Sequence, residues 1–192
     1  MQTLPKPSYL KIVVTGPFGS GKTTFIKTVC GDILGTDRNV TSPYEKMVKR
    51  KTTVAFDYGK VYVKNIPIHL FGTPGQTRFQ FMIKVLTVGM HGYIFIIDGS
   101  SIKEVLRGKI LYDNMLSYSR YPHIIAINKQ DIRGSLSLSE VSKIMNISKD
   151  RLYPLIALDK NSALRILNVT VDKILTHRLL IQKKLRNIRY KI

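Results

Sequence analysis

The sequence predicts an α/β fold, a single domain in which about five helices cover a six-stranded, mostly parallel sheet. Short runs rich in β-branched residues alternate along the chain with segments of helical periodicity, as in strand–helix–strand units. A glycine-rich turn joins the first such run to the first helical segment. The chain has 192 residues, a length at which one domain can bury a full hydrophobic core. We therefore interpret residues 1–192 as one domain.

The strands are expected where the sequence is apolar and β-branched, at residues 9–14, 53–63, 66–71, 93–98, 123–127 and 153–158. Only Lys64 and Asn65 separate the second strand from the third, which favours an antiparallel hairpin within the otherwise parallel sheet. The unbroken apolar run at 93–98 is typical of a strand buried on both faces. Residues 32–51 show no periodicity, and we interpret them as a long functional loop.

Helices are placed by apolar periodicity and by end signals, at residues 22–29, 102–116, 138–145 and 163–188. Gly31 is expected to end the first of them. The last helix carries an apolar stripe that we expect to pack on the sheet, formed by Leu164, Leu167, Val171 and Ile174. Cys30 lies near the end of the first helix and is interpreted as a small buried apolar residue.

The charge balance is strongly basic, with 31 Lys and Arg against 12 Asp and Glu and a formal net charge of +19. Such an excess favours polyanionic partners, although a lysine-rich soluble surface would give the same charge balance. Hydrophobic residues at 44% and charged residues at 22% exclude a disordered or fibrous chain. The apolar runs are too short to span a bilayer, and the N-terminus shows no targeting pattern. With one cysteine and therefore no internal disulfide, we expect a cytoplasmic location.

Residues 16–23, Gly-Pro-Phe-Gly-Ser-Gly-Lys-Thr, form a complete G-x-x-x-x-G-K-[ST] phosphate loop between the first strand and the first helix. Its glycines let backbone N–H groups turn around a β-phosphate without Cβ clashes, and the helix N-terminus adds positive charge. We expect Lys22 to contact the β- and γ-phosphates and Thr23 to ligate Mg²⁺. The phosphate-binding residues expected here are Gly16, Phe18, Gly19, Ser20, Gly21, Lys22, Thr23 and Thr24.

The sequence Asn128-Lys129-Gln130-Asp131 directly follows a predicted buried strand and indicates which base is bound. The Asp131 carboxylate can accept hydrogen bonds from both N1–H and N2–H₂ of guanine. Adenine lacks that donor pair, and a buried polar mismatch costs about 1–3 kcal/mol or more. Asn128 is expected to contact the purine and tether the phosphate loop, while the Lys129 stem covers the base. The site is therefore predicted to bind GTP and GDP.

These motifs resemble those of the Ras-like small GTPase superfamily over nearly the whole chain. Within it, the chain is most similar to prokaryotic small GTPases related to the signal-recognition-particle receptor β subunit and to the bacterial polarity GTPases. The resemblance also rests on residues 51–57 and 71–76. It implies the small G-protein fold of a P-loop NTPase, acting as a guanine-nucleotide switch that hydrolyses GTP. It also implies partners of the roadblock or longin type.

The resemblance implies a role for each matching residue. Thr53 would reach Mg²⁺ and the γ-phosphate, and the Gly75 N–H would meet the γ-phosphate. Gln76 matches the glutamine that orients the attacking water in Ras. Ala157 and Leu158 lie where the last motif of the family contacts the base.

Two departures from the family pattern affect the chemistry. Gly72 stands where the superfamily has an aspartate that holds Mg²⁺ through water, and losing such a partner weakens metal binding about 10–100-fold. Asp98 ends a strand and could substitute, but an ordinary strand-end role is favoured because the resemblance places it one strand too late. Pro17 and Phe18 are bulky beside the expected γ-phosphate, so intrinsic hydrolysis is predicted to be slow.

Arg50 lies three residues before Thr53, a spacing similar to that of the cis arginine in heterotrimeric G-protein α subunits. It would then stabilise transition-state charge together with Lys22 and Gln76. The alternative is that Arg50 belongs to a solvated basic run, Lys49-Arg50-Lys51, and this interpretation is favoured.

The segment 177–192 mixes basic and apolar residues and contains no acidic one. It could lie on an anionic membrane as a peripheral contact, or extend a charged helix face into solvent, which is favoured. No recognition motif accompanies the charge, so nucleic acid is not expected as a partner. Two further functions stay open beside a slow GTPase: a scaffold that binds nucleotide without hydrolysing it, and a tether that acts through the basic tail.

Overall fold

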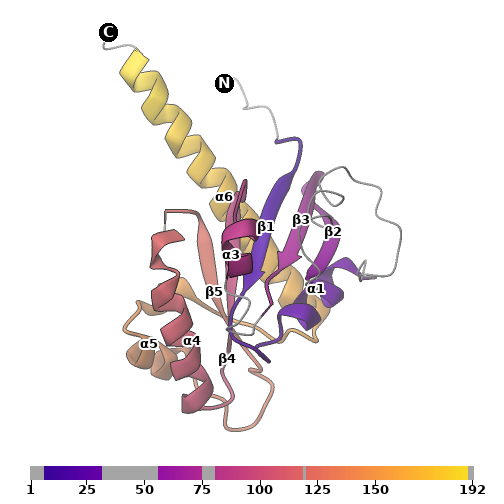
Figure 1. Cartoon of the computed structure of the whole chain (residues 1–192), viewed down its shortest axis with the longest axis vertical. Helices are drawn as coiled ribbons and strands as arrows, with labels where there is room; N and C mark the ends of the chain where they lie inside the picture. Colours follow the sequence, from indigo (N-terminus) through magenta and orange to yellow (C-terminus); the bar gives the residue numbers. More distant parts are fainter. Residues whose placement is uncertain (1–6, 32–55, 75–80, 119, 190–192) are drawn as a thin grey trace.

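The structure, a computed structural model, describes residues 7–31, 56–74, 81–118 and 120–189 (Figure 1). Six strands form one sheet in the order β2-β3-β1-β4-β5-β6. The strands are β1 (Leu10–Thr15), β2 (Asp57–Val63), β3 (Ile66–Gly72), β4 (Gly92–Asp98), β5 (His123–Asn128) and β6 (Leu152–Pro154). Only the β2–β3 pair is antiparallel, as the two-residue turn predicts. The predicted fold class is confirmed.

Five α-helices lie in the described residues: α1 (Lys22–Cys30), α3 (Phe81–Leu86), α4 (Ile102–Asn114), α5 (Leu138–Met145) and α6 (Lys160–Arg189). Two single-turn 3₁₀ helices follow α4 and α5, at Leu116–Tyr118 and Lys149–Arg151. None of these described helices combines the length and the apolar composition that crossing a membrane requires.

The helices cover both faces of the sheet, and the central strands show why. In β1, Ile12 and Val14 pack with residues of α1 and α6, while Val13 packs in a second cluster with residues of α4 and α5. Every residue of β1 and β4 is buried. The apolar runs at 12–14 in β1 and 93–97 in β4 follow from this burial, because successive side chains enter opposite layers of the core.

Side chains define where two of the helices begin. Ser101 accepts a hydrogen bond from the Glu104 N–H at the start of α4. Ser137 and Glu140 form a reciprocal capping box at the start of α5. Such caps satisfy backbone donors that the helix itself cannot pair, and each contributes about 1 kcal/mol.

The boundaries differ from the expectation at the last strand and at several helix ends. The expected strand 153–158 ends at Pro154. Leu155 still donates to the Ile127 carbonyl, but the next two N–H groups bond to side chains: Ile156 donates to Ser162 Oγ and Ala157 to Asn128 Oδ1. The last helix begins at Lys160, three residues early, because the Asp159 carboxylate accepts the Ser162 N–H and caps it.

The sequence patterns also missed or misplaced smaller features. Helix α4 ends at Asn114 rather than 116, and α3 has no periodic pattern long enough to be placed from sequence. The expected loop at 32–51 and the start of the strand predicted at 53–63 lie outside the described residues.

Candidate functional site

The phosphate loop joins β1 to α1 at the carboxyl end of the strand. Gly16 has a φ of +142°, and a Cβ there would lie 2.0 Å from the carbonyl oxygen of Ile96. Gly21 has a φ of +98°, and a Cβ there would lie 2.2 Å from Nδ2 of Asn128. Both positions require glycine, because the loop backbone lies directly against β4 and the end of β5.

The first turn of α1 is suited to an anion. Its N-cap, Gly21, supplies no side-chain acceptor, and no first-turn residue is acidic. The N–H groups at the positive end of the helix dipole therefore have no capping side chain. The Ser20 hydroxyl is also buried, and among the described residues it has no hydrogen-bond partner. An unpaired buried hydroxyl costs about 1–3 kcal/mol, which a bound phosphate oxygen would recover.

Lys22 places its ammonium inside this loop. The side chain is buried, and Nζ donates to the carbonyl oxygens of Gly16 at 3.0 Å and Pro17 at 2.7 Å. Burial lowers the pKa of Lys22 to about 8, although the Asp57 charge opposes this shift. An ammonium has three N–H donors, so the two carbonyls orient the group and leave one donor for an anion.

Asn128 connects three separate segments through one buried amide. Its Nδ2 donates to the Ser20 carbonyl at 2.8 Å, and its Oδ1 accepts the Ala157 N–H at 2.8 Å. The residue itself ends β5 and is 4% exposed. The tether to the phosphate loop that the sequence predicts is present, and the same side chain also positions the loop after β6.

The turn that follows Asn128 presents the remaining residues of the motif. Lys129 has a φ of +65°, which a non-glycine residue adopts only when its surroundings hold it, and the Ser135 hydroxyl donates to its carbonyl at 2.6 Å. Its ammonium pairs with Asp98. Asp131 is exposed in the same turn.

Asp98 has its own partners at this end of β4. Besides the Lys129 ammonium, it accepts the Ser100 N–H at 2.9 Å. Burial would raise the pKa of Asp98, but the hydrogen bonds from Lys129 and Ser100 outweigh it and lower the pKa. The carboxylate thus stabilises the turn after β5, which is the strand-end role rather than the role of a magnesium partner.

A different carboxylate lies beside the phosphate loop. The Thr23 hydroxyl donates to Oδ2 of Asp57 at 2.5 Å. Asp57 is the first residue of β2, directly opposite Gly72 in the antiparallel register. A Cβ on Gly72 would lie 3.0 Å from Cβ of Asp57 and 3.1 Å from Oδ2. The Asp57 side chain therefore occupies the space into which an aspartate at position 72 would extend.

Asp57 is not among the site residues expected from the sequence, although the hairpin carries a signal for it. The two-residue turn at 64–65 fixes the hairpin register, and counting outward from Val63 and Ile66 pairs position 57 with position 72. A carboxylate opposite the departing glycine could have been identified from that register.

The other expected contacts divide between the surface and the interior. Phe18 is 60% exposed and Leu158 is 78% exposed, whereas Ala157 is buried and Thr24 is half-buried. Arg50, Thr53, Gly75 and Gln76 lie outside the described residues, so their roles stay predictions.

Comparison with known proteins shows one family over most of the chain. A model of the ADP-ribosylation factor family matches residues 2–179. An uncharacterized protein of Methanocaldococcus jannaschii is 32% identical over 141 residues, which cover 73% of this chain and 82% of that protein.

Eukaryotic relatives are similar over a comparable length. ADP-ribosylation factor-like protein 2 of Arabidopsis thaliana is 25% identical over 145 residues, or 74% of this chain and 71% of that protein. ADP-ribosylation factor-like protein 1 of Saccharomyces cerevisiae is 26% identical over 154 residues, or 77% of this chain and 76% of that protein.

Replacing Asn128 by Ala should lower the free energy of unfolding by about 2–4 kcal/mol, because the Ser20 carbonyl and the Ala157 N–H both lose their buried partner. Urea denaturation measures the difference. Asn114→Ala, at the exposed end of α4, is the control and should change stability by no more than about 0.5 kcal/mol. Equal effects of the two substitutions would contradict the role assigned to the Asn128 amide.

Proposed function

Because the chain belongs to the ADP-ribosylation factor family of small GTP-binding proteins, we propose that it is a molecular switch that binds GTP and GDP with Mg²⁺ and hydrolyses GTP slowly. The observation that carries the proposal is the phosphate loop, with a buried ammonium and an uncapped helix N-terminus on one side and the Asn128 amide on the other. The nucleotide that co-purifies, identified by chromatography after denaturation, tests it directly.

Phosphate binding would use charges that are already in position. The carbonyls of Gly16 and Pro17 hold the Lys22 ammonium, so little side-chain entropy is lost when a phosphate oxygen accepts its remaining donor. The N–H groups of the loop and of the first turn of α1 supply further donors. The Ser20 hydroxyl is buried in the same loop and would donate a hydrogen bond to a phosphate oxygen.

Base selection would follow from the turn after β5. The Asp131 carboxylate would accept N1–H and N2–H₂ of guanine, and Asn128 already joins that turn to the phosphate loop. The ion pair between Lys129 and Asp98 restrains the lysine stem that is proposed to cover the base. Ala157, positioned by Asn128, and Leu158 would complete this side of the site.

The residues beside the phosphate loop fit Mg²⁺, which prefers hard oxygen ligands and keeps several waters. Thr23 would ligate the ion together with Thr53, and the Asp57 carboxylate would replace the missing aspartate of position 72. When bound, the ion neutralises charge on the nucleotide phosphates.

Hydrolysis would depend on residues outside the described part of the chain. Gln76 is proposed to orient the attacking water, and Thr53 and Gly75 to respond to the γ-phosphate. Arg50 is proposed as a contributor to transition-state stabilisation, with the solvated basic run as its alternative. The bulky Phe18 at the loop is the reason to expect a slow intrinsic rate.

A scaffold that binds nucleotide without hydrolysing it is the second candidate function, favoured by Gly72 and Phe18. Multiple-turnover phosphate release in the presence of Mg²⁺ separates the two: a scaffold retains its nucleotide and releases no phosphate above a buffer control.

The proposal also covers where the protein is located and which partners it binds. We propose a cytoplasmic protein, with the basic end of α6 as a peripheral membrane contact or tether, and a regulator of the roadblock or longin type. That partner class rests on a further proposal, that the chain is similar to prokaryotic GTPases related to the signal-recognition-particle receptor β subunit and to the bacterial polarity GTPases.

Lys22→Ala should reduce GTP affinity by more than about 100-fold and abolish hydrolysis, because the buried ammonium is the only side-chain cation that the described residues place in the loop. Equilibrium binding of a fluorescent GTP analogue measures the loss. Lys27→Ala, an exposed lysine of the same helix, is the control and should bind like wild type. Unchanged affinity in the Lys22 variant would refute nucleotide binding in this loop.

Asp131→Asn should lower GTP affinity at least about tenfold, since one carboxylate oxygen becomes an N–H₂ donor that faces the donors of guanine. The same change should raise affinity for xanthosine triphosphate, which carries a carbonyl oxygen at C2. Competition binding with GTP, XTP and ATP measures both effects. Asp150→Asn, exposed and remote in sequence, should leave all three affinities unchanged.

Asp57→Asn should raise the Mg²⁺ concentration needed for tight nucleotide retention about 10–100-fold, because the amide keeps the shape but loses the charge. Release of a fluorescent GDP analogue during a Mg²⁺ titration measures it, with Asp113→Asn as the charge-matched control.

Moving the carboxylate back across the hairpin gives a rescue test. Asp57→Gly combined with Gly72→Asp removes the Cβ that would clash and should recover most of the Mg²⁺ response. If Asp57→Asn and Asp113→Asn behave alike, Asp57 has no role toward the metal.

A further inference from the structure

Helix α4 has two apolar faces, and the sheet covers only one of them. Its buried residues are Val105, Gly108 and Tyr112. Gly108 fixes this orientation, because a Cβ there would lie 2.8 Å from Cγ2 of Ile97 in β4. The helix backbone therefore lies directly on the strand, and the side chains of the opposite face point away from the core.

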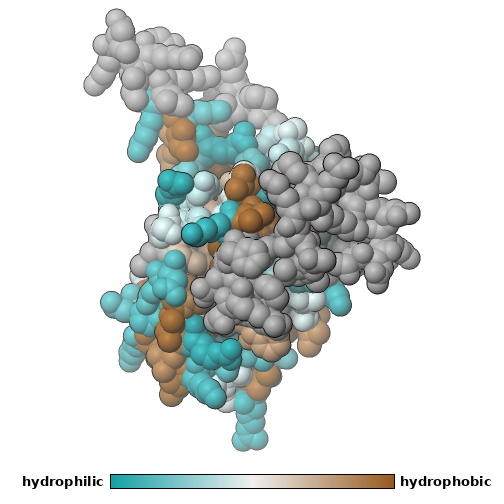
Figure 2. Space-filling model, viewed as in Figure 1, coloured by the Kyte–Doolittle hydropathy of each residue, from teal (hydrophilic) through white to brown (hydrophobic). Residues whose placement is uncertain are grey.

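The outer face of α4 carries an exposed apolar stripe. Ile102 is 60% exposed, Leu106 is 45% exposed and Ile110 is 66% exposed. They are spaced four residues apart, so each lies about 40° around the helix axis from the one before, and the three form one row. Figure 2 shows hydrophobic residues following this helix along the surface turned to the viewer. Such a row favours contact with another apolar surface, because water is a poor solvent for it.

Exposed apolar residues on α6 are arranged differently. Leu179, Leu180 and Ile181 are consecutive, so their side chains leave the helix in directions about 100° apart. They cannot form one continuous row, as the residues of the α4 stripe do.

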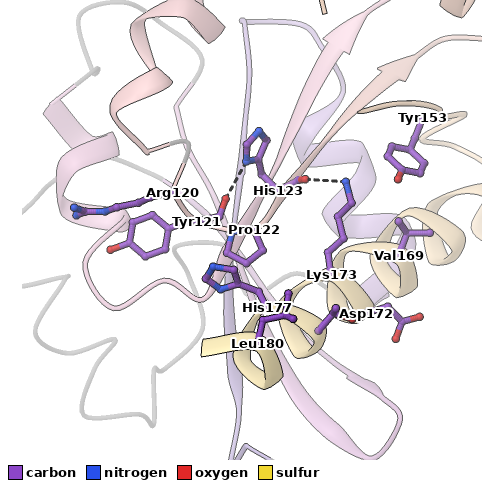
Figure 3. A pocket seen from close by; sticks show the side chains of 11 residues that line it. Arg120, Tyr121, Pro122, His123, Tyr153, Val169, Asp172, Lys173, His177 and Leu180 are labelled. Atoms are coloured by element: carbon purple, nitrogen blue, oxygen red, sulfur yellow. Dashed lines mark hydrogen bonds between the residues drawn. The ribbon is translucent and has the colours of Figure 1, made fainter. Parts of the chain in front are cut away.

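A concave surface at the amino end of β5, with a volume of about 540 Å³, also has apolar walls (Figure 3). There the Lys173 ammonium donates to the His123 carbonyl at 3.5 Å, and Asp172 pairs with Lys64. Arg120 lines this pocket as well, but it points away from Lys173. The charged side chains of the pocket therefore do not converge on a ligand, whereas the α4 stripe presents a continuous apolar surface.

The charged side chains beside the α4 stripe are self-complementary. Lys103 and Asp113 each lie five residues from position 108, one before it and one after it. At about 100° per residue, they stand on opposite sides of a line that passes between Leu106 and Ile110. Lys103 is exposed and takes part in none of the salt bridges between described residues. Asp113 is exposed and pairs with Lys109 at 3.1 Å, which leaves further acceptor sites on the carboxylate.

An antiparallel pair of α4 helices would satisfy the apolar and the charged pattern together. A twofold axis at the level of position 108 places Leu106 opposite Ile110 of the second copy, and Ile110 opposite Leu106 of that copy. The same axis places Lys103 opposite Asp113 of the second copy, once on each side of the apolar contact. Ile102 would lie at the rim of this contact.

The remaining cations of α4 do not oppose this pairing. Arg107 and Lys109 lie farther from the stripe, and the twofold axis would bring them toward each other. Each already has a carboxylate partner in its own chain, Glu104 for Arg107 and Asp113 for Lys109. Their charges are therefore largely compensated before the two copies meet.

We propose that α4 is an interface between two copies of this chain, formed as an antiparallel helix pair around Leu106 and Ile110. The charge pattern favours a second copy over an unrelated partner, because Lys103 and Asp113 complement each other only when the same helix is turned end over end. Three apolar side chains bury less than the about 800 Å² per partner of a standard interface, so the dimer should dissociate on dilution. The proposal does not involve the phosphate loop, and its failure would leave nucleotide binding unaffected.

Sedimentation velocity of the full chain over a concentration series tests the proposal. The wild type should shift from monomer to dimer between about 10 and 500 μM, as suits a contact below standard size. Leu106→Gln and Ile110→Gln should each raise the dissociation constant about tenfold or more, because each substitution removes an apolar side chain from both halves of the contact. Leu179→Gln is the matched control, since Leu179 is 44% exposed but lies on α6, and it should change the constant less than about twofold.

Two charge reversals test the register of the helix pair. Lys103→Glu and Asp113→Lys each place like charges opposite each other at both sites, and each should weaken the dimer about fivefold or more. An equimolar mixture of the two variants should associate to within about threefold of wild type, because the mixed pair again holds opposite charges at both sites. Circular dichroism and GTP binding should match wild type in every variant.

Three results would overturn the proposal. A wild type that stays monomeric up to about 500 μM would assign the stripe to contact with a different molecule. Equal weakening by Leu106→Gln and Leu179→Gln would place the dimer contact elsewhere on the surface. A mixture of the two charge variants that associates no better than either variant alone would exclude the antiparallel pairing.

Discussion

The buried amide of Asn128 is the interaction on which the geometry of the candidate site depends. It joins the end of β5 to the phosphate loop through Ser20 and to the loop after β6 through Ala157. Each of these segments is irregular, and its backbone groups would otherwise be buried without partners at a cost of about 1–3 kcal/mol each. The glycines of the phosphate loop belong to the same constraint, since a Cβ on Gly21 would displace that amide. One side chain therefore keeps the phosphate-binding and base-binding elements at a fixed separation.

A second constraint is volume at the start of the β2–β3 hairpin. Position 57 faces position 72 across the ladder, and the space between them and Ile26 holds a single carboxylate side chain. In this chain the carboxylate comes from β2 and reaches the Thr23 hydroxyl. The departure at Gly72 is thus accompanied by a carboxylate that reaches the same space from the neighbouring strand. A motif can change in this way without loss of its charge, because the antiparallel register brings two chain positions to one place.

The two ends of the sheet differ in what they offer. The carboxyl ends of β1 and β5 carry loops whose backbone donors and buried lysine suit a phosphorylated nucleotide. Open α/β sheets commonly bind their ligands at this edge. The amino end of β5 carries a pocket with two cations, aromatic walls and a helix that extends beyond the domain. The high net charge of +19 is in line with an anionic ligand, but the charge by itself does not identify one.

The sequence by itself determined the fold class, the phosphate loop and the turn at 128–131, because each is a pattern of neighbouring residues with a local physical meaning. Examples of such local patterns are the apolar runs in β1 and β4 and the glycines at positions 16 and 21. Only the tertiary structure decided that Asp57 meets Thr23, that Asp98 pairs with Lys129, that β6 ends at Pro154, and that Arg120 and Lys173 share a pocket. These outcomes depend on contacts between residues far apart in the chain, whose spacing no local pattern records.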